Sequence, residues 1–412
     1  MTKYGAVSVD RLSTIMRTIL RQLHKLGEDG PVALTNGLTV GGEWKVLKKL
    51  GEGGCGAVYM VENVKDLRKA ALKAESNFVE GGSVLKLEYN YGNQILPYAQ
   101  ILTKLKGKKH VPELIHAGKK EKYQYMVMSL LGDSLCDVLK SCGKQLTIST
   151  QLRLGVHVLH GLKQIHDSGF VHRDIKPANL ALGNRDGGTD PNFIYVLDFG
   201  LSRSFVVEEE GVQVLRKPRK HALFRYCRIL SSDGHPIRSN DQYRGFGTTR
   251  YCSADANEKK DQGRVDDLWS MLYVMVELRG KLPWSNLHDK KELAAAKRAV
   301  DDNTLFSKCP NQLRDFAAHL RILDYWTRPD YLLLYKSLTD GMTEGGYKFS
   351  DPWDWQGKIK DGSSKGSSLK SLSLKRNKSS KGVKKSAKDK TTDLPDEHPF
   401  NDDDFATNPL GF

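Results

Sequence analysis

Residues 172–179 read HRDIKPAN and residues 198–200 read DFG, and these two stretches decide the fold of the chain. Between them, residues 193–197 form a short apolar run that predicts a β-strand. The spacing predicts that two carboxylates, an amide and a lysine from these stretches converge. Because carboxylate and amide oxygens are suitable ligands for Mg²⁺, the pattern predicts a site for a magnesium-bound phosphate group.

The two stretches match the catalytic-loop and metal-binding motifs of protein kinases. In that pattern Asp174 accepts or orients the proton of the attacking hydroxyl, and Lys176 neutralises charge on the transferred phosphoryl group. Asn179 and Asp198 each hold Mg²⁺ against the β- and γ-phosphates of ATP. A single triplet of this kind occurs by chance in long chains, whereas the whole set in this order indicates a kinase catalytic centre.

A glycine-rich stretch upstream, residues 51–58 (GEGGCGAV), predicts a phosphate-binding loop. Gly51, Gly53 and Gly56 would let the backbone approach triphosphate oxygens without obstruction, and Val58 would line the same ATP site. The glycine spacing alone also fits a dinucleotide-binding loop or an ordinary hairpin. A predicted strand follows the glycines here, not a helix, and this disfavours dinucleotide binding.

Lys73 lies on the next predicted strand, where an unpaired ammonium facing a cleft would be costly. We therefore expect Lys73 to bind the ATP phosphates and to pair with a carboxylate, for which Glu88 is the candidate. A lone lysine on a strand is more often an edge residue with its ammonium in water. Its place after the glycine-rich stretch favours the nucleotide-binding role.

Three residues further along are predicted to support the fold more than the chemistry. Asp267, in the sequence DLWS, is expected to begin a long central helix and to accept backbone amides of the catalytic loop. Thr248, in GTTRY, lies where kinases close the activation segment, and Arg328, in RPDY, resembles the late arginine of the helical lobe.

Strand-like composition dominates residues 44–125, and helical periodicity dominates residues 130–338. Strands followed by helices predict an α+β, bilobal protein-kinase fold, with a small β-rich N-lobe and a larger helical C-lobe. The expected regions are an N-terminal extension 1–43, a kinase domain 44–356 divided into N-lobe 44–128 and C-lobe 129–356, and a tail 357–412.

The two flanking regions differ in character. The extension contains an amphipathic helix, residues 8–26, expected to pack on the main domain; a docking helix or a mitochondrial presequence are the alternatives. The tail has a charge of +10 over residues 357–392 and −6 over residues 393–412. Its Lys/Ser-rich composition predicts disorder. Its acidic end is a candidate autoinhibitor for the basic substrate groove, and its serines are candidate autophosphorylation sites.

The formal charge of +15 over 412 residues indicates anionic partners such as phosphates or acidic peptides. No recognition motif accompanies this charge, so we expect no specific nucleic-acid binding. The six cysteines are scattered, which predicts reduced thiols, and no apolar run approaches the roughly 18 residues of a membrane-spanning helix. We expect a monomer without membrane association, in the cytoplasm and also the nucleus.

Four stretches identify a group within the kinases. The sequence YCSADAN stands at residues 251–257, where most kinases carry Ala-Pro-Glu, and the others are LDFGLSR (197–203), LDYWTRPDY (323–331) and SDPWDW (350–355). On these features the chain resembles the casein kinase I group, tau-tubulin kinase-like branch, over about residues 44–355. The resemblance implies serine/threonine specificity, ATP and Mg²⁺ as cofactors, and protein substrates that are acidic or already phosphorylated.

The resemblance also implies roles for three further residues. Met128 would border the adenine pocket, and the backbone at Leu130 would bind the adenine edge. Arg250 matches the first basic residue of a site for acidic or phosphorylated substrates. The usual lysine partner has no clear equivalent, because Lys290 and Lys291 are nearby but shifted.

Two inserts, residues 89–98 and 226–246, depart from the family pattern. They are either tolerated surface loops or products of an imprecise gene model. Gly92 and Pro97 cost about 1 and 3 kcal/mol inside a helix, so the first insert would tilt Glu88 away from Lys73. The leading hypothesis is an active serine/threonine kinase, and the alternative is a pseudokinase or kinase-fold scaffold with impaired Lys73–Glu88 coupling.

Overall fold

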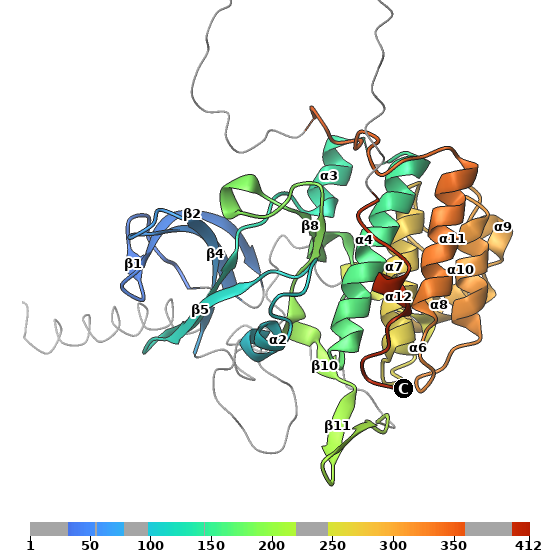
Figure 1. The fold of residues 1–412 in the computed structure, drawn as a ribbon, viewed down its shortest axis with the longest axis horizontal. Coiled ribbons are helices and arrows are strands. Elements are labelled where there is room, and N and C mark those ends of the chain that lie inside the picture. The colour runs from blue at the N-terminus through green and yellow to red at the C-terminus, as the bar shows by residue number, and fades with distance from the viewer. Residues whose placement is uncertain (1–31, 54–55, 78–97, 144, 220–245, 359–397) are drawn as a thin grey trace, which may run out of the picture.

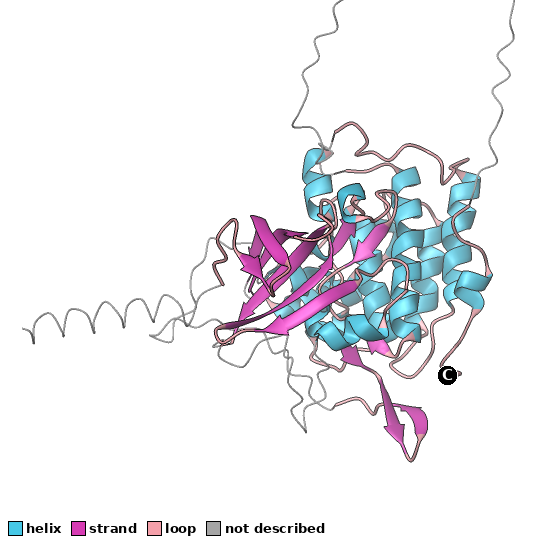
Figure 2. Cartoon of the chain, turned by 60° about the vertical axis from the view of Figure 1, so that its left-hand side comes forward, coloured by secondary structure: helices cyan, strands magenta, loops and turns pink. Residues whose placement is uncertain are grey.

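The computed structural model describes residues 32–53, 56–77, 98–143, 145–219, 246–358 and 398–412. A six-stranded antiparallel sheet forms one lobe and helices dominate the other (Figure 1). The same division is clear in Figure 2, where strands and helices separate into two bodies. The predicted α+β, bilobal architecture is thereby confirmed. The sheet has the order β1-β2-β3-β4-β6-β5, with β1 (Thr39–Val40), β2 (Trp44–Gly53), β3 (Gly56–Asn63), β4 (Lys69–Ser76), β5 (Leu114–Lys119) and β6 (Tyr123–Ser129).

Strand β3 shows how the sheet divides two cores. Its burial alternates along the strand, as expected when successive side chains point to opposite faces. Tyr59 and Val61 contribute to a small core confined to the N-lobe, which Trp44 and Leu72 complete from the neighbouring strands. Val58 packs against the larger core that continues into the helical lobe. The second face of the sheet therefore meets the other lobe, where a nucleotide would bind.

The N-lobe begins earlier than residue 44, the boundary expected from the sequence. Strand β1 pairs with β2, and Val40 is buried beneath them. The Tyr59 hydroxyl also donates to the Val32 carbonyl and accepts from the Leu34 amide. These contacts attach residues 32–40 to the sheet. The amphipathic helix expected at residues 8–26 lies outside the described residues.

In the C-lobe, helix α4 (Ile148–Asp167) is buried along most of its length and contacts α7 and α11. It leads directly into β7 (Phe170–Val171), after which the catalytic loop begins.

Within the described ranges, no helix is both long and apolar enough to cross a bilayer. The remaining helices of this lobe and of the lobe junction are α2 (Tyr98–Lys104), α3 (Leu135–Ser141), α5 (Phe246–Tyr251), α6 (Ala254–Asn257), α7 (Arg264–Glu277), α8 (Lys290–Ala299), α9 (Asp302–Leu305), α10 (Gln312–Arg321), α11 (Tyr331–Glu344) and α12 (Asp403–Ala406).

Three short strand pairs carry the functional loops. The catalytic loop runs from β7 to β8, and the DFG triplet follows β9. The pairs are β7 with β10 (Arg203–Ser204), β8 (Leu180–Leu182) with β9 (Ile194–Val196), and β11 (Val206–Glu209) with β12 (Val212–Leu215). The β7–β10 and β8–β9 pairs thus hold the strands that flank both motifs.

The last fifteen residues, 398–412, correct the prediction of a disordered tail. This C-terminal segment lies against α4 and α11, and its short helix α12 contacts both (Figure 1). Phe400 and Phe405 are buried in the C-lobe core, which offsets the entropy lost on ordering the segment. The prediction failed because the Lys/Ser-rich composition of the tail outweighed these two aromatic residues. The autoinhibitory role of the acidic end stays a prediction, and residues 359–397 are outside the described residues.

A cluster of buried histidines lies beneath the C-terminal segment. The ring centroids of His157 and His160 are each 5.1 Å from that of Phe400, and His110 stacks on Phe193 at 5.0 Å. Burial, together with neighbouring positive charge, lowers the pKa of His110 to about 3 and that of His160 to about 4. Burial likewise lowers the pKa of His157. The folded protein therefore holds these rings neutral.

We predict that stability falls as the pH falls below about 6.5, the ordinary histidine value. The folded-state pKa values are lowered, so the unfolded chain binds more protons between pH 6.5 and 4, and folding becomes less favourable there. Each histidine would contribute up to about 1.4 kcal/mol per pH unit. Urea unfolding at pH 7, 6 and 5 measures this slope, and His157→Phe should reduce it. A stability unchanged from pH 7 to 5 would contradict the prediction.

Candidate active site

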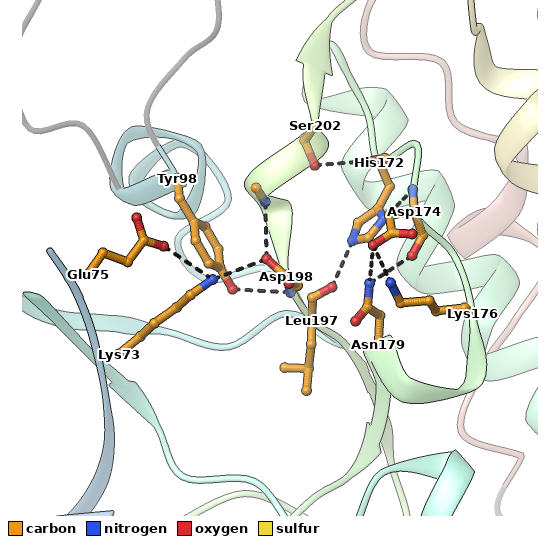
Figure 3. Close-up of polar contacts among 11 residues, drawn as sticks. Lys73, Glu75, Tyr98, His172, Asp174, Lys176, Asn179, Leu197, Asp198 and Ser202 are labelled. Carbon is orange, nitrogen blue, oxygen red and sulfur yellow. Dashed lines mark hydrogen bonds and ion pairs between the residues drawn. The ribbon is translucent and has the colours of Figure 1, made fainter. Parts of the chain in front are cut away.

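Three side chains of the loop between β7 and β8 meet at one carboxylate (Figure 3). Lys176 Nζ lies 2.7 Å from Asp174 Oδ2, and Asn179 Nδ2 donates to the same oxygen at 2.9 Å. Asn179 also donates to the Asp174 carbonyl at 2.8 Å, which closes the loop on itself. Asp174 and Asn179 are buried, so these charge-assisted contacts are protected from water. The structure therefore brings together the predicted set from HRDIKPAN.

Asp198 lies at the lobe junction in a left-handed conformation, with φ at 63°. Its Oδ1 accepts from Lys73 Nζ at 3.3 Å and from the Gly200 amide at 3.3 Å. Burial alone would raise the pKa of Asp198, but the charges of Lys73 and Lys176 lower it below its usual range. Asp198 is therefore held ionised, as a metal ligand requires.

Lys73 extends from β4, the strand that the N-lobe sheet places between β3 and β6. Its side chain is 10% exposed, and besides Asp198 it approaches Glu75 Oε1 at 3.7 Å. Glu75 is two residues along the same strand and therefore lies on the same face as Lys73. This two-residue repeat is visible in the sequence, so it could have predicted the pairing of Lys73 with Glu75. The predicted partner Glu88 lies outside the described residues, so the Lys73–Glu88 pair remains a prediction.

Tyr98, the first residue of helix α2, is a junction residue that the sequence interpretation missed. Its hydroxyl accepts from the Asp198 amide at 3.1 Å, and its ring centroid lies 5.0 Å from Lys73 Nζ (Figure 3). The ring also lies 5.7 Å from that of Phe199. Burial raises the pKa of the Tyr98 hydroxyl, so it stays protonated and neutral. Sequence analysis placed Tyr98 at the end of the insert 89–98, whereas the structure buries it as the first residue of α2.

The glycine-rich stretch forms the turn from β2 to β3, where Gly53 pairs with Gly56. A Cβ on Gly56 would lie 2.2 Å from the Ala74 carbonyl oxygen, and φ is 126°, so only glycine fits there. A Cβ on Gly51 would meet nothing within 4 Å, so packing does not require glycine at that position. Residues 54–55, at the tip of the turn, lie outside the described residues.

Apolar side chains line the junction beside this turn. Met128 on β6 and Leu130 just after it are buried in the core shared by the lobes, and Val58 of β3 packs against that core. Ala71 pairs with Met128 across β4 and β6. The structure thus gathers the residues expected to surround an adenine ring, although they come from different strands.

The residues at the junction fit a magnesium ion whose coordination shell is completed by the phosphates of ATP. Asn179 uses its amide nitrogen for Asp174, which leaves its amide oxygen as the ligand atom, and Asp198 supplies a carboxylate. Over the described part of the chain, no group of three or more His, Cys, Asp or Glu side chains could hold a metal ion by itself. Mg²⁺ normally needs only one or two protein carboxylates when phosphates supply the rest.

A comparison with known families settles the class of the protein. The protein kinase domain model matches residues 44–331, which is well over half of the chain. The chain belongs to the protein kinase family.

Individual relatives support this assignment. A Caenorhabditis elegans protein carrying the name of a serine/threonine-protein kinase is 40% identical over 388 residues, covering 94% of this chain and 99% of the relative. An inactive tau-tubulin kinase of the same organism is 32% identical over 259 residues, covering 61% of this chain and 82% of the relative. A third Caenorhabditis elegans protein, which carries the name of a casein kinase I, is 31% identical over 321 residues, covering 76% of this chain and 83% of the relative. Because one relative is named inactive, membership in the family does not by itself establish activity.

In this kinase, Asp267 of α7 holds the catalytic loop, as the sequence predicted. Its Oδ2 accepts from the His172 amide at 2.6 Å and its Oδ1 from the Arg173 amide at 2.7 Å. His166 Nε2 approaches the same carboxylate at 3.0 Å. Burial would raise the pKa of Asp267, but the hydrogen bond and charge of His166 lower it. An ionised carboxylate therefore fixes the backbone immediately before Asp174.

In the region expected to recognise substrates, the basic side chains of Arg250 and Lys297 form hydrogen bonds within the protein. Arg250 donates to Glu277 Oε1 of α7 at 3.1 Å and is 35% exposed on its side chain. Lys297 of α8, which the sequence interpretation did not select, is buried and donates to the carbonyls of Thr249 at 2.8 Å and Cys252 at 2.6 Å. Lys297 thus fixes the backbone around Arg250, and Lys290 lies at the start of the same helix. The Thr248 side chain lies outside the described residues.

A second buried carboxylate, Asp261, organises the segment after DFG. Arg203 Nη1 contacts both of its oxygens, at 2.8 and 3.2 Å, and the Arg219 amide donates to it at 3.1 Å. Beside it, Arg173 Nε donates to Gln262 at 3.1 Å. Burial would raise the pKa of Asp261, but Arg219 and Arg203 lower it. Sequence reasoning missed this anchor because its partners are more than forty residues away along the chain.

Replacing Asp267 with Asn should lower the free energy of unfolding by about 1–3 kcal/mol, because the new NH₂ group would face a backbone amide and leave it unsatisfied. The neighbouring Asp266 provides a matched control. Its carboxylate accepts from the Gly263 amide at 2.7 Å and from the Ser253 hydroxyl, and burial raises its pKa to about 7.

Asp266→Asn should therefore cost less, since Asn has one acceptor for Gly263 and one donor for Ser253, and the folded state already favours a neutral group there. Chemical denaturation of both variants at pH 7 measures the difference. A larger loss in Asp266→Asn than in Asp267→Asn would show that Asp267 is not the stronger anchor.

Proposed function

We propose that this protein is an active serine/threonine protein kinase that transfers the γ-phosphoryl group of ATP to protein hydroxyls. The observation that carries the proposal is the contact between Lys73 and Asp198. A lysine from the β-lobe and a carboxylate from the helical lobe meet at 3.3 Å, next to the Asp174, Lys176 and Asn179 set. Catalysis of phosphoryl transfer depends mainly on positioning and charge, and this arrangement supplies both.

Each residue has a role that follows from its contacts. Asp174 orients the substrate hydroxyl and accepts its proton, while Lys176, 2.7 Å away, neutralises charge that develops on the transferred group. Asn179 and Asp198 hold Mg²⁺, which neutralises phosphate charge when bound. Lys73 binds the phosphates from the opposite side of the junction.

Nucleotide binding is assigned to the surrounding strands. The backbone of the Gly51, Gly53 and Gly56 turn covers the phosphates, and close approach at Gly56 fixes where that turn lies over β4. Met128 and Val58 enclose the adenine ring, and the backbone at Leu130 binds its polar edge. Glu88 remains the proposed helix-borne partner of Lys73.

For substrates, we propose acidic or already phosphorylated proteins recognised near Arg250, by a monomeric kinase of the tau-tubulin kinase-like branch. The positive charge of the chain supports anionic substrates. Arg250 pairs with Glu277 and is partly exposed, so an anionic side chain would compete with that carboxylate. We place the kinase in the cytoplasm and nucleus.

The test compares wild type with Asp198→Asn and Asp174→Asn, using Mg-ATP and casein as an acidic protein substrate. Loss of the carboxylate at either position should reduce labelling by about 100-fold or more, because each residue provides charge or proton transfer at the reacting atoms. Phosphoamino-acid analysis of the product should show phosphoserine and phosphothreonine. Equal labelling by wild type and Asp198→Asn would leave a pseudokinase or scaffold as the function.

Tyr98 offers a second test of the junction. Tyr98→Phe removes the acceptor for the Asp198 amide but keeps the ring beside Lys73, so kcat should fall about tenfold with a small change in the KM for ATP. Tyr98→Ala also removes the ring and should lose more activity. Steady-state kinetics with varied ATP measure both effects. Tyr123→Phe, at the start of β6 where it pairs with Ser76, serves as control, and full activity of Tyr98→Ala would remove the assigned role.

A further inference from the structure

The face formed by α4 and α11 receives two aromatic anchors from the C-terminal segment. Phe405 stacks on Tyr335 of α11, with ring centroids 4.1 Å apart and planes 9° apart, and it is fully buried. Phe400 lies among the histidines of α4 described above. Four residues separate the two anchors, so one short peptide reaches both. Buried aromatic anchors of this kind dominate the affinity of peptide-binding sites.

The polar contacts around these anchors are complementary in charge. The segment has three aspartates and no Lys or Arg, whereas the face beneath it presents cations. Lys336 Nζ lies 2.7 Å from Asp402, and Lys163 Nζ donates to the Thr407 hydroxyl at 2.7 Å. Two arginines bind backbone oxygens in the last six residues of the segment. Arg328 donates to the Thr407 carbonyl at 2.8 Å, and Arg264 donates to the Phe412 backbone oxygen at 3.1 Å.

The segment also supports its own bound conformation. The Asn401 amide donates to the Asp404 carboxylate at 2.9 Å, and the Asp404 amide donates to the Asn401 side chain at 3.0 Å. This reciprocal pair closes the turn that leads into helix α12, and this helix carries the buried Phe405. A peptide with local contacts of this kind loses less conformational freedom on binding.

We propose that the face of α4 and α11 is a peptide-binding site, and that its resident ligand is the chain's own residues 398–412. The site recognises an acidic peptide with two phenylalanines five positions apart and a hydrogen-bonded Asn–Asp pair between them. Residues 359–397 tether this ligand, so the site is filled within the molecule by a high effective concentration. Because none of the contacts given above involves Lys73 or Asp198, it is a binding function separate from phosphoryl transfer.

The test separates ligand from tether in the folded, full-length protein. A specific protease site is introduced within residues 359–397, and the protein is cut after purification. We expect residues 398–412 to stay bound without a covalent link and to elute with the kinase in gel filtration. A fluorescent synthetic peptide of the same sequence should then displace them in a saturable manner, and it should not bind the uncut protein at the same concentrations.

Variants of the competing peptide test the recognition without altering the kinase. The Phe405→Ala peptide should compete about 100-fold more weakly, because it loses the buried anchor on Tyr335. The Asp403→Ala peptide is the matched control and should compete like wild type, since Asp403 is exposed. Three outcomes would each overturn the proposal. The fragment could be lost on cutting and fail to rebind, excess peptide could fail to displace it, or the Phe405→Ala peptide could compete as well as wild type.

Discussion

The buried carboxylate of Asp267 fixes the backbone on which the reactive groups depend. It accepts the consecutive amides of His172 and Arg173, and this pair of hydrogen bonds holds Arg173 at a φ of 70°, a conformation costly for a residue with a side chain. The chain direction leaving Arg173 determines where Asp174 points. Since the carboxylate is almost fully buried, water does not compete for these amides. The position of Asp174, the proposed catalytic residue, therefore depends on a residue more than ninety positions away.

The other half of the site depends on charge balance across the lobes. Burying the Lys73 ammonium would be unfavourable without a counter-charge, and Asp198 and Glu75 provide it. The same ammonium keeps Asp198 ionised, so each group favours the charged form of the other. Tyr98 adds a neutral contact to both, through its ring and its hydroxyl. A phosphate–magnesium group entering here would find complementary charges already in place, which lowers the cost of reorganisation.

Sequence reasoning succeeded where the chemistry is local or where a family motif marks the residue, as for Asp267, and failed for tertiary contacts that no motif marks. Asp174, Lys176 and Asn179 lie within six residues, so spacing alone predicted their meeting. The two-lobed fold followed from strand-like and helical periodicity. Tyr98 could not be assigned, because its partners Lys73 and Asp198 lie on segments far from it in sequence. The burial of Phe400 and Phe405 was missed for a different reason: composition averaged over the tail hides two anchors whose partners belong to α4 and α11.

The start of α7 shows why this helix is central to the molecule. Within residues 261–267, Asp261 holds arginines of the segment after DFG, Asp266 holds the turn at Ser253 and Gly263, and Asp267 holds the catalytic loop. Carboxylates in the first turn of a helix are also favoured by its dipole. Arg264, in the same turn, donates to the end of the C-terminal segment and lies over the ring of Phe205. Residues 261–267, which include the end of the preceding loop and the first turn of α7, thus contact four segments of the chain.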